Sequence, residues 1–425
     1  MNRRSFFQAS AGTVAAALQT QIGARAFAAA TASVKGKSPD EIATDEDFWA
    51  EVRNEFNTDR SIINMNNGYM SPSPRVVHDA LKRYLDYSNM GPYHTMVQQL
   101  YPKVETARRM IAEAAGVDPE EIAITRNSSE ALEIAQLGIN LKAGDEVLTT
   151  NQDYPRMITT FRQRVRRDGI KFKEISFPVP AISQDDLYRR IEQAVTPQTK
   201  VILICHITNR TGVIFPVRRI ADMAQARGIT VIVDGAHAFS QFPFKISDLN
   251  CDFYGVSLHK WTYAPCGTGF LYVRRSKIKD TWALMASGER QDDNVRKFEE
   301  IGTHPGANFN AICEAVVFNR DLGIDRKAAR LRYLRDRWAN QLAQNPKVKI
   351  LHNPGSEMSA GIGMFSVTGA DPRKLVDQLQ AKHFIYLGLM PHAEYIGIRV
   401  TPNVYTTLEE VDYFAQAVER QLKNS

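Results

Sequence analysis

Lys260 stands directly after a short apolar run, in the stretch G-V-S-L-H-K-W, a few residues before the turn P-C-G-T-G. A solvated surface lysine needs no such setting, whereas a lysine that bonds covalently to a cofactor does. The sequence therefore predicts Lys260 to be an amine nucleophile at the end of a strand.

Other polar side chains follow other apolar runs. Asp234 ends V-I-V in the segment V-D-G-A-H-A-F, and His237 comes three residues later. A carboxylate at the end of a buried strand costs several kcal/mol to desolvate unless it has a partner; in isolation, a helix N-cap explains it as well. Ser128 and Ser129 open a helical pattern after E-I-A-I-T, where free backbone N–H groups favour a phosphate, although such serines are also common caps.

The remaining candidates are Asn209, after K-V-I-L-I-C-H-I-T, and Ser257 and His259, just before Lys260. Ligands of open α/β sheets bind at the carboxyl ends of the strands, so all these side chains should meet at one edge. Together they supply an anion cradle, a carboxylate for a protonated ring nitrogen, donors for a phenolic oxygen and an amine. This set matches pyridoxal 5′-phosphate, with Lys260 bonded to the cofactor and Asp234 keeping the pyridine nitrogen protonated.

The elements that must position these residues are short β-rich runs separated by longer amphipathic stretches. The runs lie at 121–125, 145–150, 171–177, 200–208, 230–235, 253–258 and 267–273, and the clearest helices at 128–141 and 216–228. This alternation predicts an α/β fold with a mainly parallel sheet covered on both faces. The last two runs are too close for a crossover helix, so they should be antiparallel and make a mixed seven-stranded sheet.

The pattern changes after about residue 310. A long helical stretch at 311–344, the run G-I-G-M-F-S-V, a helix at 371–383, the run Y-I-G-I-R-V and a last helix from Leu408 predict a small C-terminal α+β domain. We therefore divide the chain into an export signal (1–28), an N-terminal extension and substrate-entry segment (29–75), a large domain (76–310) and a small domain (311–425).

The N-terminus has the layout of an export signal. Arg3, Arg4 and Phe6 precede a weakly apolar run and small-x-small cleavage sites, for example after Ala28. The paired arginines resemble a twin-arginine signal, with Asn2 where a serine or threonine is usual; a mitochondrial-type leader or a frayed helix is the alternative. The expected location is the periplasm, reached by a folded protein that already carries its cofactor.

Composition argues against several other classes of protein. Beyond residue 28 the chain holds 50 basic and 47 acidic side chains and no basic stripe with interleaved aromatics, so no nucleic-acid partner is expected. No later segment reaches the roughly 18–20 apolar residues that span a bilayer. The four cysteines lack the spacing of metal ligands or of a disulfide framework, and we expect reduced, mostly buried thiols, with Cys266 packed rather than reactive.

Across roughly residues 60–420 the chain resembles the class V aminotransferase group of fold-type I pyridoxal-phosphate enzymes, which includes isopenicillin N epimerase and the cysteine desulfurases. The most specific part is V-D-G-A-H-A-F followed by S-L-H-K, with 26 positions from Asp234 to Lys260. The resemblance implies the following roles: phosphate binding by Ser128 or Ser129, Ser257 and His259; ring stacking by Tyr154; and contacts to the ring oxygen from Asn209 and His237.

The resemblance also implies roles for residues outside the predicted sheet. Thr303 corresponds to a threonine that completes the partner subunit's phosphate site, which implies a homodimer. Arg399 matches the arginine that binds the substrate's α-carboxylate through a bidentate pair, although a surface arginine on a small-domain strand is the alternative. The early segment S-I-I-N-M-N-N-G-Y-M resembles the entry segment of the epimerase-like branch, where Asn66, Asn67 and Gly68 would line the substrate pocket.

One departure from the family pattern narrows the function. A desulfurase needs a nucleophilic cysteine on the loop before Arg399, and here the segment L-G-L-M-P-H-A-E-Y has none. We therefore expect an exported enzyme that acts at the α-carbon or amino group of a small-molecule amino acid or a peptide-borne one, as an aminotransferase or epimerase. The exported members that it resembles most remodel a peptide siderophore. Two alternatives stay open: a lyase that cleaves C–S bonds by β-elimination, and a binding protein without chemistry.

Overall fold

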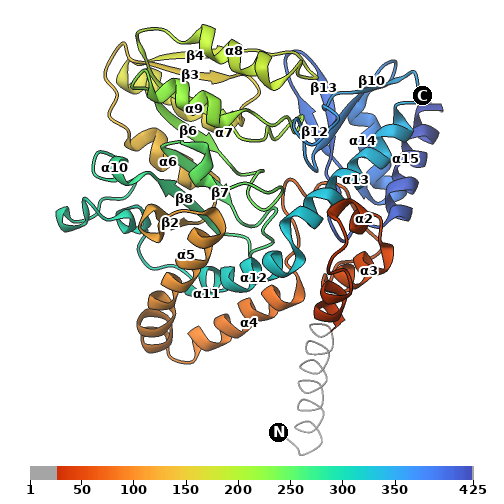
Figure 1. Ribbon diagram of the computed structural model, residues 1–425, viewed down its shortest axis with the longest axis horizontal. Coiled ribbons are helices and arrows are strands. Elements are labelled where there is room, and N and C mark those ends of the chain that lie inside the picture. Colours follow the sequence, from red (N-terminus) through yellow and green to blue (C-terminus); the bar gives the residue numbers. More distant parts are fainter. Residues whose placement is uncertain (1–25, 424–425) are drawn as a thin grey trace, which may run out of the picture.

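The computed structural model describes residues 26–423, so the predicted export signal lies outside the described part of the chain except for residues 26–28. A large domain is built around one sheet, and a smaller α+β body packs beside it (Figure 1). None of the helices between residues 26 and 423 combines the length and the apolar character that crossing a membrane requires.

The central sheet has seven strands in the order β2-β8-β7-β6-β5-β3-β4. Strand β8 runs antiparallel to both β2 and β7, and the other neighbouring pairs are parallel, so the prediction of a mixed sheet is confirmed. The strands are β2 (Ile122–Thr125), β3 (Glu146–Thr150), β4 (Lys171–Ile175), β5 (Thr199–Cys205), β6 (Thr230–Asp234), β7 (Phe253–Ser257) and β8 (Gly269–Val273).

Both faces of this sheet are buried, which explains why its strands read as continuous apolar runs. On β5, Ile202 and Ile204 face one core cluster, and Val201 and Leu203 face another. Helices α6 (Ser128–Gly138) and α7 (Pro155–Asp168) cover one face, and α5 (Tyr101–Ala115), α8 (Gln184–Ala194) and α9 (Val217–Gln225) contribute to the core on the other. Successive side chains of each strand therefore pack into two different cores, one on each face of the sheet.

The small body has an antiparallel sheet in the order β12-β13-β10-β9. Its elements are α13 (Ile324–Leu342), β9 (Val348–Ile350), β10 (Gly363–Val367), α14 (Pro372–His383), β12 (Gly388–Pro391), β13 (Ile396–Val400) and α15 (Leu408–Lys423). The single helix predicted over 311–344 is wrong. It is two helices, α12 (Ile312–Leu322) and α13, separated by Gly323, whose φ of 84° breaks the helical path.

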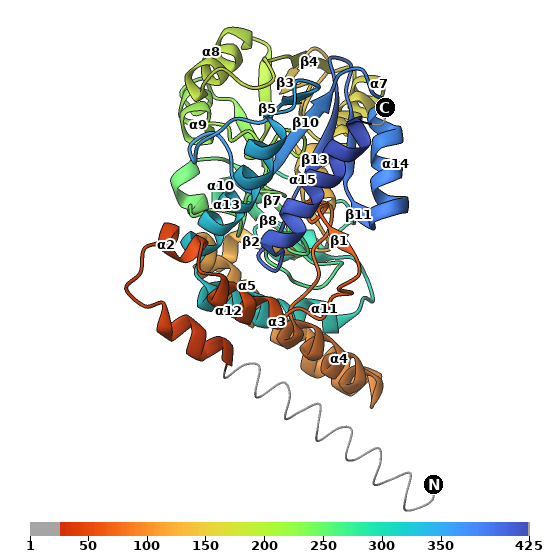
Figure 2. The same cartoon turned by 90° about the vertical axis from the view of Figure 1, so that its right-hand side faces the viewer.

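The N-terminal extension packs on the small body. Helix α2 (Pro39–Ala43) contacts α13, α3 (Glu46–Asn54) follows it, and β1 (Ile63–Asn64) pairs in parallel with β11 (Ile385–Tyr386), as Figure 2 shows. The chain then reaches Asn67, whose N–H donates to the Thr401 carbonyl at 3.2 Å. This pairing brings the predicted entry segment against the end of β13.

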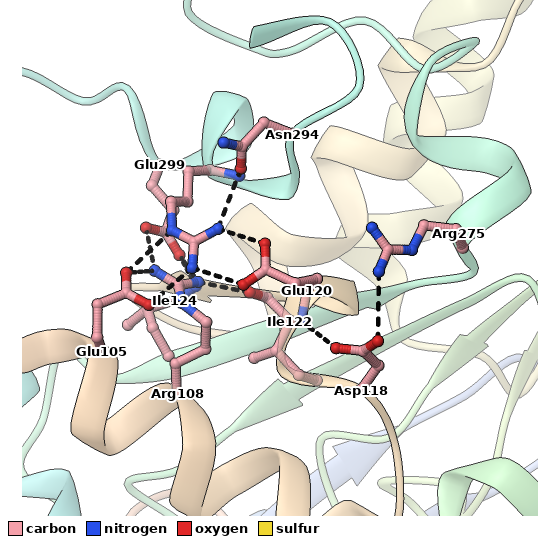
Figure 3. Close-up of polar contacts among 10 residues, drawn as sticks. Glu105, Arg108, Asp118, Glu120, Ile122, Ile124, Arg275, Asn294 and Glu299 are labelled. Atoms are coloured by element: carbon pink, nitrogen blue, oxygen red, sulfur yellow. Dashed lines mark hydrogen bonds and ion pairs between the residues drawn. The ribbon is translucent and has the colours of Figure 1, made fainter.

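A charged network closes the outer edge of β2, where a free edge would otherwise expose unpaired backbone groups. Glu299 accepts a hydrogen bond from the Ile124 N–H at 2.5 Å, and Arg108 donates to the Ile122 carbonyl and pairs with Glu299 (Figure 3). Glu299 ends the 3-10 helix η5 (Val295–Glu299), which leads into the segment that carries Thr303. The network therefore fixes both the strand before the predicted phosphate site and the segment that leads to Thr303.

Candidate active site

The strand ends named above open into one cavity of about 860 Å³ between the large sheet and the small body. Cys205, Asp234 and Gly255 lie in register across β5, β6 and β7, so their following residues emerge side by side. The structure brings most of the predicted residues to this cavity. Its lining includes Gly68, Ser128, Ser129, Tyr154, Asn209, Asp234, His237, Ser257, His259, Lys260 and Arg399.

One end of the cavity is built to hold an anion. Helix α6 begins here, and the Ser257 hydroxyl accepts from the Ser128 N–H at 2.9 Å and donates to the Ser128 hydroxyl at 2.8 Å. The loop can pass this close because Gly269 has no side chain: a Cβ there would lie 2.7 Å from Asn127 Cα. Free N–H groups and hydroxyls at a helix N-terminus suit a phosphate.

His259 stands beside this cradle with a buried Nδ1 that has no hydrogen-bond partner among the described residues. Burial, reinforced by the nearby Lys260, lowers the pKa of His259 to about 4, so the ring is neutral. A buried polar atom without a partner costs free energy, which an acceptor or donor on a bound ligand would recover. His259 therefore fits a phosphate group in the cradle.

Asp234 lies at the end of β6, 5% exposed, where its carboxylate accepts a hydrogen bond from the Ala236 N–H at 3.0 Å. Burial raises the pKa of Asp234, and the charge of Lys260 opposes that shift. A buried carboxylate is stable as an ion when a cation or a protonated ring nitrogen faces it. This environment is the one expected for the partner of a pyridinium nitrogen.

Lys260 and His237 are in direct contact, with Nζ and Nε2 3.1 Å apart. The indole of Trp261 donates to the other ring nitrogen, Nδ1 of His237, at 3.4 Å. Burial lowers the pKa of His237 well below its usual range, so the ring is neutral and carries its single proton on Nε2. The Nε2–H can then donate to Lys260 when the amine is neutral.

The surroundings of Lys260 shift its amine toward the neutral form. Burial lowers the pKa of Lys260 to about 8, although the Asp234 carboxylate works in the opposite direction. A lysine with a depressed pKa has more of the neutral amine, the nucleophilic and proton-accepting form, near neutral pH than an ordinary lysine has. The site thus increases the share of Lys260 that can condense with an aldehyde.

Arg399 reaches the cavity from β13 and is 3% exposed. Its Nη1 donates to the Asn209 carbonyl at 2.8 Å, its Nη2 donates to Asn66 Oδ1 at 2.9 Å, and its Nε finds no partner within residues 26–423. Gly68 packs against it, because a Cβ at that position would lie 3.5 Å from Arg399 Cζ. The guanidinium is held on two sides and offers the rest of its surface to an anion.

Three predicted residues lie outside the lining of this cavity: Asn66, Asn67 and Thr303. The Asn66 side chain contacts the site through Arg399, from which its Oδ1 accepts a hydrogen bond. Asn67 is fully buried and turned away from the cavity: it donates to the Asn64 and Thr401 carbonyls and accepts from the Tyr405 hydroxyl at 2.6 Å. Thr303 is exposed and does not line the cavity. Asn67 therefore holds the entry segment in place, while Thr303 faces outward.

The expectation for Cys266 is wrong. Its side chain is exposed and lines the cavity, because it sits in the turn between β7 and β8 and not in a core. Among the described residues all four cysteines are free, and Cys205 and Cys251 are buried as predicted. No cluster of three or more His, Cys, Asp or Glu side chains in the described part of the chain is placed to hold a metal ion.

Sequence reasoning missed three residues of the site. Asp153, directly before Tyr154, is 1% exposed and lies near Asp234; burial raises the pKa of Asp153 to about 6. Trp261 fixes the tautomer of His237, and Arg210 lines the cavity. The signal for Asp153 was its position after a strand, whereas the contacts of Trp261 and Arg210 depend on tertiary packing.

Comparison with known proteins places this geometry in a family. The sequence profile of class V aminotransferases matches residues 64–414, which is most of the chain. The chain belongs to the class V aminotransferase family. This membership confirms the predicted fold, the prediction of an enzyme and the dependence on pyridoxal 5′-phosphate.

Relatives of this class V enzyme include two kinds of catalyst. Isopenicillin N epimerase of Streptomyces clavuligerus is 27% identical over 388 residues, covering 87% of this chain and 98% of the relative. A probable cysteine desulfurase of Halobacterium salinarum is 27% identical over 383 residues, covering 84% and 91%. The structure of a cysteine desulfurase from Thermococcus onnurineus NA1 is similar in fold, with a TM-score of 0.78 at 24% identity, covering 88% and 98%.

The residues present fit the cofactor of the family. The Ser128 cradle and the unpartnered His259 Nδ1 match the phosphate of pyridoxal 5′-phosphate, the buried Asp234 matches its ring nitrogen, and Asn209 matches its ring oxygen. Lys260 completes the set with an amine whose pKa burial lowers. The fit rests on the atoms of this site and agrees with the family assignment.

Proposed function

We propose that this class V enzyme acts at the α-carbon of an amino acid, free or carried on a peptide, as an aminotransferase or an epimerase. One observation carries the proposal: the Lys260 amine lies 3.1 Å from Nε2 of His237 in a cavity that Arg399 also lines. A base beside Cα and a cation for the α-carboxylate are the two features that chemistry at Cα requires.

When bound, pyridoxal 5′-phosphate supplies an aldehyde that condenses with amines and a ring that delocalises the electrons released at Cα. The Ser128 cradle and His259 would bind the phosphate, and Asp234 would hold a proton on the ring nitrogen. Tyr154 lines the same cavity, where its ring could stack on the pyridine. Lys260 lines that cavity too and would supply the amine.

The chain's own residues then handle the substrate. Arg399 binds the α-carboxylate through its free guanidinium edge, which fixes the direction of the Cα–H bond. Lys260 would accept the α-proton at Nζ, and His237 would orient Nζ through its Nε2–H. Delivery of that proton to the bound cofactor would give transamination, and delivery to the opposite face of Cα would give epimerisation.

β-Elimination is the alternative, because removal of the same α-proton precedes loss of a sulfur leaving group. The relatives that are named as cysteine desulfurases support β-elimination as the alternative. The loop before Arg399 carries no cysteine in this chain, which favours reactions that do not need a nucleophilic thiol there.

We also propose that the enzyme is exported by a twin-arginine signal at residues 1–28 and works in the periplasm as a homodimer. Arg3 and Arg4 support the export route, and residues 1–25 lie outside the described part of the chain. The exposed position of Thr303 is compatible with a partner's phosphate site. Cell fractionation of wild type against Arg3→Lys/Arg4→Lys, and sedimentation of the purified protein, test the two statements.

The reaction type is tested with the purified enzyme loaded with pyridoxal 5′-phosphate. A panel of amino acids and siderophore peptides is incubated in deuterated water, and the visible band, Cα deuterium content, chirality and keto-acid products are followed together. Conversion of the cofactor to its amine form identifies an aminotransferase, and deuterium with inversion at Cα identifies an epimerase. Pyruvate with a released thiol would instead identify the lyase, and a stable band with no exchange at any Cα would contradict the proposal.

A further inference from the structure

Arg210 is a second arginine of the cavity whose charge has no partner. It follows β5 directly after Asn209, is 9% exposed, and its Nη1 donates to the Pro391 carbonyl at 2.8 Å. Its Nε is buried without a hydrogen-bond partner among the described residues. No ion pair within residues 26–423 includes it. A buried guanidinium of this kind is costly until an anion completes its coordination.

Arg210 and Arg399 are neighbours in space. Arg399 donates to the Asn209 carbonyl, which belongs to the peptide bond that leads into Arg210. The proximity also appears in the electrostatics: burial, reinforced by the charge of Arg210, lowers the pKa of Arg399 to about 10. The two guanidiniums repel each other, and Asp234 is the one carboxylate in the described part of the chain that lines the cavity. Balancing the charges of both arginines therefore requires more than one bound anion.

The cofactor's phosphate is not the anion that would pair with Arg210. The phosphate cradle is built at the ends of β2 and β7, and Arg210 follows β5 on the other side of β6 in the strand order. Arg210 also turns toward the small body, where it contacts Pro391 and lies against the Tyr395 hydroxyl. It therefore lies on the substrate side of the cavity.

We propose that Arg210 binds a second carboxylate of the substrate, so that the enzyme takes amino acids with an acidic side chain, free or within a peptide. The inference rests on the proposed function, in which Arg399 binds the α-carboxylate. A planar guanidinium with unused donors recognises a carboxylate by paired hydrogen bonds. Its burial beside the small body also gives selectivity, because an uncharged side chain would leave the guanidinium unpaired.

The test compares dicarboxylates with monocarboxylates of equal carbon number on the cofactor-loaded enzyme. Succinate, glutarate and adipate are titrated against butanoate, pentanoate and hexanoate, and dissociation constants are read from the change in the visible band or by calorimetry. The variants are Arg210→Gln, Arg210→Lys and Arg156→Gln. Arg156 is the matched control, because it lines the same cavity but is exposed and solvated.

In the wild type at least one dicarboxylate should bind about tenfold to a hundredfold more tightly than its monocarboxylate partner. Arg210→Gln should reduce that ratio to near one, Arg210→Lys should restore part of it, and Arg156→Gln should leave it in place. A ratio near one for every pair in the wild type would overturn the proposal. An equal loss of affinity for dicarboxylates and monocarboxylates in Arg210→Gln would also overturn the proposal, because Arg210 would then bind the same carboxylate as Arg399. Failure of the proposed function is distinguishable, since it would appear as a stable visible band with no exchange at any Cα, whatever the ratio of the dissociation constants.

Discussion

The Nε2 of His237 lies 3.1 Å from the Nζ of Lys260, and the Trp261 indole N–H donates to the other ring nitrogen, Nδ1. This relationship assigns the proton of the neutral ring to Nε2, which can donate to the neutral amine of Lys260. His237 therefore favours the reactive form of Lys260 over the charged one.

The first prediction concerns pH. Because burial lowers the pKa of Lys260 to about 8, the reactive neutral form accumulates as pH rises through about 8, well below the usual lysine value. The rate at which apoenzyme combines with pyridoxal 5′-phosphate should rise with pH and level off above that point. His237→Ala should move the midpoint upward by removing the donor to the neutral amine, and exposed His94→Ala should not move it. A wild-type midpoint near 10 would show that the amine is charged.

The second prediction concerns Asp234. Asp234→Asn keeps the shape but removes the charge that holds a proton on the ring nitrogen. The visible band should persist, while the rate of α-proton exchange should fall about tenfold to a hundredfold, the equivalent of about 1.5–3 kcal/mol for a charge-assisted hydrogen bond. Burial raises the pKa of Asp234, so the apoprotein should not lose thermal stability. Exchange at the wild-type rate would remove Asp234 from the mechanism.

The third prediction concerns Cys266. This exposed thiol lines the cavity, but it follows β7 and does not lie on the loop before Arg399. Cys266→Ala should exchange the α-proton of amino acids at a rate within about twofold of the wild type. Loss of activity together with loss of sulfide release from cysteine would instead make Cys266 a nucleophile and favour desulfurase chemistry.

The fourth prediction concerns the N-terminus that the proposed export would leave. Phe27 is buried, and its ring stacks on Phe318 with centroids 5.0 Å apart. Cleavage after Ala28 would remove it, whereas cleavage after Ala26, the end of the small-x-small sequence A-R-A, would retain it. Mass spectrometry of periplasmic protein should find Phe27 at or after the first residue. Protein that begins at Ala29 should melt at a lower temperature, since burying a phenylalanine contributes about 1.5–3 kcal/mol; equal melting would contradict this.

Much of the site was predictable because it follows a topological rule. Asp234, Ser257 and Asn209 each come after an apolar run, and parallel strands bring such positions to one edge of the sheet. The mixed character of the sheet was predictable from the short connection between β7 and β8, whereas the strand order depends on pairing between distant segments. Gly323, which separates α12 from α13, was visible in the sequence, but helical periodicity on both sides concealed the break.

The residues that were missed depend on contacts between distant segments. Arg210 belongs to the site because β12 of the small body lies across its side chain, and no local pattern encodes that docking. Asn66 and Asn67 are adjacent and chemically alike, yet one holds Arg399 and the other is buried against Thr401. Which of two neighbouring side chains faces a cavity follows from the pairing of β1 with β11, and the sequence alone does not reveal it.

The most direct test of the central claim is the covalent chemistry of Lys260. Wild-type protein loaded with pyridoxal 5′-phosphate should have a visible band that borohydride abolishes, leaving the cofactor attached to the peptide that contains Lys260. Exposed Lys200→Ala should behave identically. Lys260→Ala should lack the band and the labelled peptide. A Lys260→Ala protein that kept the same reducible band would contradict the account.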